Sequence, residues 1–221
     1  MRLQLLLLCL ASPMAAQSVR ARLEGRVPAE VIPTIDSLVQ TAAAESLPAE
    51  LLVQKAIEGG AKHVAPEYIV VAVRVNLDQL RRARNMLVDG GDKPPTTAEE
   101  VATLNTALKR GLAPPTVARI VEALPAEPRS AAFHAVADLV GHGFDQDSAA
   151  DLILAAASMG LRGERLLDVA DKAILELQSG RGYTEALGTV QSQLPQVSTT
   201  KVPDPSGQAV RPVQQAPRSR P

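Results

Sequence analysis

Apolar residues recur every three or four positions along most of the chain, and this spacing limits the fold more than any other feature of the sequence. An α-helix brings such positions onto one face, whereas a half-buried strand needs strict alternation. Six stripes of this kind begin at Val31, Val101, Val117, Ala132, Leu166 and Ala186. We therefore predict an all-α fold.

One stretch, residues 69–75, is rich in β-branched valine and isoleucine, which favour strands. A lone strand has no partner to pair with, and Leu77, Leu80 and Leu87 continue a helical stripe beyond it. We expect a long helix from about Pro66 to Val88, with a strand or a break in this stretch as the alternative.

Five junctions between the helical stretches share one pattern: a turn residue followed by a large apolar residue. They begin at Ser46, His63, Gly111, Gly143 and Gly160. Glycine ends a helix in the left-handed conformation, and the next apolar residue folds back onto that helix. In four of the junctions an acid follows three positions after the apolar residue, where it meets the positive end of the next helix dipole. The junction at Gly111 has proline instead, which the first turn tolerates.

The apolar junction residues lie at positions 47, 64, 112, 144 and 161, so their spacings are close to multiples of about sixteen. Two further breaks fall near the expected places, at 94–96 and 125–128, whereas the one expected near 80 is absent, consistent with the long helix predicted there. Short helices joined by tight turns at a fixed period indicate an array or irregular superhelix. The alternative is an irregular bundle whose helices happen to have similar lengths.

The two ends of the chain differ from this pattern. Residues 195–221 alternate proline with polar residues and carry no apolar stripe, so we predict a disordered tail. Residues 17–27 hold three arginines and few apolar residues, and we expect a loose lead-in there. The helical domain is thereby predicted to span 28–194.

Residues 1–16 have the features of an export signal: Arg2, an apolar run from Leu3 to Ala11, and small residues before Gln17. The segment is too short for a membrane anchor, which takes roughly 20 apolar residues. A lipid anchor on Cys9 is a second alternative, although bulky Leu8 fits that processing poorly. We expect cleavage after Ala16 and a periplasmic or secreted bacterial protein, with no transmembrane segment in the mature chain.

Composition narrows the function classes. Cleavage would remove Cys9, the only cysteine, and with it any thiolate ligand or thiol nucleophile. The whole chain has net charge −1, with no basic excess of the kind that nucleic-acid binding proteins show. Its charge is uneven, because residues 195–221 carry +3. With two tyrosines, two phenylalanines and no tryptophan, the chain suits aliphatic helix packing better than stacking on aromatic rings.

The richest polar cluster lies in residues 55–63, where Lys55, Glu58, Lys62 and His63 surround a Gly-Gly pair. These side chains could hold a phosphate or a carboxylate, although the spacing is not that of a P-loop. The competing interpretation is a helix end, with Gly59 and Gly60 breaking the helix and Lys62 and His63 solvating the turn.

Other motifs are incomplete. His134 and His142 could share a helix face only if the helix passed Gly141. The acids at 145, 147 and 151 resemble the start of a calcium loop, but alanines occupy its sixth and twelfth positions, so these acids are better explained as helix N-terminal charges. We predict no catalytic residue, cofactor or metal.

These features favour a non-enzymatic protein-interaction or scaffold module of the cell envelope, with an unknown protein or envelope partner and no nucleic acid. One alternative is a protein that binds a small anion or metabolite at residues 55–63. Another is an envelope enzyme whose site carries no known motif.

Overall fold

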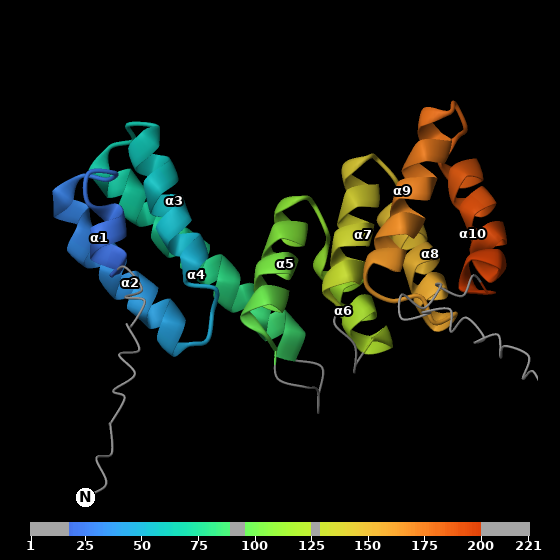
Figure 1. Cartoon of the computed structure of the whole chain (residues 1–221), viewed down its shortest axis with the longest axis horizontal. Helices are drawn as coiled ribbons and strands as arrows, with labels where there is room; N and C mark the ends of the chain where they lie inside the picture. The colour runs from blue at the N-terminus through green and yellow to red at the C-terminus, as the bar shows by residue number, and fades with distance from the viewer. Residues whose placement is uncertain (1–17, 89–95, 125–128, 200–221) are drawn as a thin grey trace, which may run out of the picture.

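The computed structural model describes residues 18–88, 96–124 and 129–199, and every regular element in these ranges is a helix (Figure 1). The predicted all-α fold is confirmed. The predicted signal segment 1–16, the breaks at 94–95 and 125–128, and residues 200–221 of the predicted tail lie outside the described residues.

The described elements follow one another in a simple order. They are α1 (Val19–Leu23), the 3-10 helix η1 (Ala29–Val31), α2 (Ile32–Ala44), α3 (Glu50–Ala61), α4 (Pro66–Val88), α5 (Ala98–Lys109), α6 (Pro114–Ala123), α7 (Ser130–Gly141), α8 (Gln146–Ser158), α9 (Glu164–Gln178) and α10 (Tyr183–Thr199).

The helices pack mainly on their near neighbours along the chain. At the N-terminal end, α1, α2 and α3 pack on one another, and α2 and α3 pack on α4. Beyond α4 the packing alternates, because α5 contacts α7 and α7 contacts α9, while α6 contacts α8 and α8 contacts α10. The result is two rows of helices extending away from the N-terminal group (Figure 1).

Helix α4 joins these two parts of the molecule. It spans 23 residues, and its bounds match the long helix predicted from the sequence. Ile69 and Val73 are buried, whereas Val71 and Val75 are exposed. The β-branched run therefore follows the helical period, and its burial against α2 and α3 outweighs the strand propensity of its residues.

The five predicted junctions have the expected backbone geometry. Ser46, His63, Gly111, Gly143 and Gly160 all have positive φ. At the first of them the Leu47 amide donates to the Ala42 carbonyl at 2.9 Å, the long hydrogen bond of a Schellman motif. The apolar residue that follows is buried at four junctions and half-buried at Val64. The turn pattern read from the sequence is confirmed at each of these positions.

Two boundaries differ from the prediction. Residues 17–27 contain helix α1 and the buried side chains of Leu23 and Val27, so the expected loose lead-in is wrong there. The arginines of this segment do not keep it in solvent, because Arg20 pairs with Asp36 at 2.9 Å and Arg22 pairs with Glu50 at 2.5 Å. Helix α10 runs on to Thr199, five residues past the predicted end, although its apolar stripe stops at Leu194.

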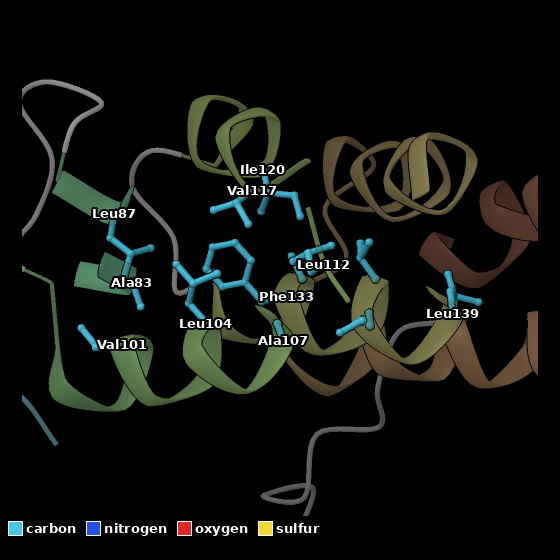
Figure 2. Packing of buried hydrophobic residues seen from close by; sticks show 14 of the residues in the cluster. Ala83, Leu87, Val101, Leu104, Ala107, Leu112, Val117, Ile120, Phe133 and Leu139 are labelled. Carbon is cyan, nitrogen blue, oxygen red and sulfur yellow. The ribbon is translucent and has the colours of Figure 1, made fainter. Parts of the chain in front are cut away.

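The core runs through the molecule without interruption. Figure 2 shows its central part, where Leu87 of α4, Leu104 of α5, Ile120 of α6 and Phe133 of α7 point toward one another. Phe133 is fully buried at this meeting point. The core therefore fixes α4 and α5 side by side, which positions the polar groups described next.

Candidate functional site

The predicted lysine–glutamate cluster forms on the exposed face of α3. Lys62 Nζ lies 2.5 Å from Glu58 Oε1, and Lys55 Nζ lies 3.0 Å from Glu58 Oε2. These three residues are three or four positions apart, the spacing that places side chains next to one another on a helix. Hydrogen bonds from Lys62 and Lys55, with their charges, lower the pKa of the Glu58 carboxyl to about 2.

This low pKa predicts how the cluster responds to acid. The Glu58 carboxyl titrates near 4.5 when the chain is unfolded, so its ion pairs stabilise the fold above pH 4.5. That contribution is lost as the pH falls from 4.5 toward 2. Lys62→Met is expected to raise the folded-state pKa of Glu58, and Lys55→Met to raise it by less, as measured by carboxyl NMR titration. A pKa that stays near 2 in Lys62→Met would contradict the assigned cause.

His63 does not belong to this cluster. It is the left-handed residue after α3, with φ of 52°, and it lines a cavity of about 480 Å³ on the side of the loop that follows α1. Gly25 to Pro28 and Gly60 also line that cavity, whereas Lys55, Glu58 and Lys62 do not. The four predicted site residues are therefore divided into two groups.

Gly59 and Gly60 do not end the helix, as one interpretation of the sequence had it. Both lie inside α3, which continues to Ala61. A Cβ atom on Gly60 would lie 1.9 Å from the Arg26 carbonyl oxygen. Glycine is needed there because the backbone of the preceding loop passes against the helix.

Another basic residue, Lys109, lies beside the Lys55–Glu58 pair, and the sequence does not predict it as part of a site. Lys109 Nζ of α5 donates to Asn76 Oδ1 of α4 at 3.0 Å, and Asn76 Nδ2 donates to the Leu51 carbonyl of α3 at 3.4 Å. Burial lowers the pKa of Lys109, the charge of Lys55 lowers it further, and Glu58 partly offsets both. Buried Asn76 thus connects three helices and holds the Lys109 ammonium near the α3 cluster.

Lys109 also lines a cavity of about 290 Å³ between α4 and α5. The other lining residues are Gln79, Arg82, Asn105 and Leu108, and together with Lys109 they define what we call the α4–α5 pocket. Asn105 is only 3 % exposed, and its side chain makes no hydrogen bond within the described part of the chain. In that same part, no carboxylate lies within ion-pair distance of Arg82 or Lys109.

An exposed apolar surface lies on the same face of α4. Tyr68, Val71 and Val75 are 64, 53 and 46 % exposed, and we call these three residues the α4 stripe. Gln79 and Arg82 follow Val75 by four and seven positions, so the helical repeat carries the stripe into the pocket. Large apolar side chains gathered on one face typically mark an interaction site, whereas single ones do not.

The remaining candidates act locally. Asp145 caps α8 by accepting a hydrogen bond from the Ser148 amide at 2.9 Å, and Asp147 lies in the first turn, so these two acids are helix N-terminal charges as predicted. Asp151 lies in the second turn of α8 and pairs with Arg119, as Asp147 also does. In the described ranges, no three histidine, cysteine or acidic side chains are grouped so that they could hold a metal ion. Among the described helices, none has the length and apolarity needed to cross a membrane.

Comparison of the chain with protein-family models, with curated proteins and with solved structures finds no match.

Proposed function

We propose that this chain is a non-enzymatic protein-interaction module of the cell envelope, exported with the help of residues 1–16. The observation that carries the proposal is the α4 stripe, in which Tyr68, Val71 and Val75 expose large apolar surfaces side by side. Keeping such a surface in water is unfavourable, at about 25 cal/mol per Å² of apolar area. A partner that covers it would recover this free energy.

The arrangement of the helices supports an extended binding platform. From α3 to α8 the helices begin at residues 50, 66, 98, 114, 130 and 146, so consecutive starts differ by 16 or 32 residues. We interpret this as a helical array in which α4 fills two units. Arrays of this kind present long surfaces to partners, because each unit contacts mainly its neighbours.

The charges next to the stripe favour an acidic partner segment. Lys55, Arg82 and Lys109 lie on or beside the α4–α5 pocket, which continues the stripe. Complementary charge speeds encounter and disfavours wrong partners. The chain's own residues 195–221 carry +3, so this surface repels them. Since Arg2 lies in residues 1–16 and the whole chain carries −1, residues 17–194 carry −5. A second copy of this chain is acidic enough to bind the same surface, so the test must distinguish a second copy from a different protein.

The test places a photo-reactive phenylalanine analogue at position 71 or 75 of the exported full-length chain. Leu175 of α9 provides the control position, because it is 62 % exposed and lies outside the stripe. We expect cross-links at 71 and 75 but not at 175, with mass spectrometry locating them in an acidic segment of another protein. Val71→Glu should reduce this cross-linking at least tenfold, while Leu175→Glu should leave it unchanged.

Two outcomes would refute the proposal. Equal cross-linking at 71 and 175 would mean that the stripe is an ordinary part of the surface. Cross-links to a second copy of this chain would mean that the stripe is a self-association surface and not a binding site for another protein. Sedimentation of the purified chain would then show a dimer.

A further inference from the structure

We propose that the α4–α5 pocket is a carboxylate-binding site, which anchors an acidic residue of a segment lying on the α4 stripe. The partner's identity rests on the proposed function, whereas carboxylate binding by the pocket does not. The pocket is lined by two cationic side chains, two amides and one leucine, which come from the neighbouring helices α4 and α5.

The pocket carries positive charge that has no acidic partner in the described part of the chain. Most other cations near this surface have acidic partners: Lys55 and Lys62 share Glu58, and Arg81 is paired with Glu45 at 2.6 Å. Among the residues that the structure describes, Arg82 donates only to the Asp78 carbonyl of its own helix, at 3.4 Å, and Lys109 donates only to Asn76. A carboxylate in the pocket would give both their missing partner, and the guanidinium could bind it with two parallel hydrogen bonds.

The Asn105 amide also favours a polar ligand. In the described ranges Arg129 Nη1 is the one fully buried side-chain polar atom without a hydrogen-bond partner, so the amide atoms of Asn105 are open to the pocket. Asn105 lines the pocket, is 3 % exposed and has no protein partner in the described ranges. Its N–H groups are available to a ligand oxygen. Gln79 supplies a second amide from the facing helix.

One of the cations is held in place before any ligand binds. Lys109 does not hang free in solvent, because Asn76 holds its ammonium and Asn76 is itself fixed to the Leu51 carbonyl. Burial, and then the charge of Lys55, lower the pKa of Lys109, and the charge of Glu58 partly offsets both. An anion bound there would stabilise the charged form of Lys109, and little side-chain entropy would be lost on binding.

The size of the pocket sets the class of ligand. A volume of about 290 Å³ is at the lower end of small-molecule sites, which typically start near 300 Å³. It accommodates the side chain of an aspartate or glutamate, or a free acid of similar size.

The experiment titrates the mature chain, residues 17–221, with N-acetylglutamate and follows amide resonances of α4 and α5, including the Asn105 side chain. We expect saturable shifts, at least fivefold weaker binding in both Arg82→Met and Lys109→Met, and unchanged binding in Arg74→Met. Arg74 is the matched control because it is exposed on α4 and does not line the pocket. Lys109→Met also removes the hydrogen bond to Asn76 and could therefore disturb folding. Arg82→Met should leave folding intact, because Arg82 is exposed.

The outcomes separate this inference from the proposed function. Shifts that are equal in Arg82→Met and Arg74→Met would overturn the pocket, as would inorganic phosphate binding more tightly than N-acetylglutamate. Binding of N-acetylglutamate without any cross-link at position 71 would support the pocket and refute the interaction surface. Cross-linking at 71 that is unaffected by Arg82→Met would show that the pocket does not anchor the partner.

Discussion

Gly60→Ala is expected to destabilise the folded domain by about 3 kcal/mol, at the upper end of the range for overpacking substitutions. The added Cβ would lie 1.9 Å from the Arg26 carbonyl oxygen, 2.9 Å from the Arg26 carbonyl carbon and 3.2 Å from the Val27 Cα. All three are backbone atoms, so no side-chain rotation can relieve the overlap. The loop after α1 would have to move away from α3, and buried Leu23 and Val27 lie at either end of it.

Urea denaturation of the purified mature chain measures this effect, with two other glycines as controls. Gly188→Ala in α10 meets nothing within 4 Å and should stabilise the fold by about 0.5–1 kcal/mol, since alanine is the better helix former. Gly59→Ala approaches only the Ile69 side chain, at 3.0 Å, and should lie between the two. If Gly60→Ala proved as stable as Gly188→Ala, the close packing of the α1 loop on α3 would be wrong.

What the sequence predicts well is local. Each junction is specified by residues within one or two turns, because a positive φ, a returning apolar side chain and a first-turn acid all act within that span. The long α4 helix was predictable for the same reason, since its buried positions follow one period from Ile69 to Leu87. Ser46 and His63 show that the junction pattern identifies the left-handed position even where the residue is not glycine.

What the sequence does not predict depends on contacts between helices. Lys109 meets Asn76 across 33 positions, and Asn76 meets the Leu51 carbonyl across 25. Neither pair shows a spacing that a helix would bring together, so the pocket could not be assembled from the chain alone. The need for glycine at position 60 has the same origin, because the backbone that requires it is 34 positions away, at Arg26.

Arg129→Met is expected to destabilise the domain by about 3–5 kcal/mol, the range measured when one partner of a buried ion pair is removed. Arg129 Nε of the α7 N-terminus donates to Glu100 Oε1 of α5 at 2.6 Å, and the two side chains are 2 and 10 % exposed. Without the guanidinium, the Glu100 carboxylate would be left nearly dry and uncompensated. Guanidine denaturation compared with Arg119→Met, an exposed arginine with two surface ion pairs, measures the difference.

Removing both charges separates the ion pair from simple packing. The double variant Glu100→Leu, Arg129→Met should recover most of the stability lost in Arg129→Met, because buried pairs are often replaced by apolar residues at little net cost. The single variant Glu100→Leu completes the comparison. If the stability lost in the double variant equals the sum of the losses in the two single variants, the two side chains are not coupled and the ion pair does not stabilise the fold. The ion pair also joins α5 to α7, and α5 carries Asn105 and Lys109 of the pocket. Arg129→Met should therefore weaken N-acetylglutamate binding as well as folding, and the double variant should restore both together.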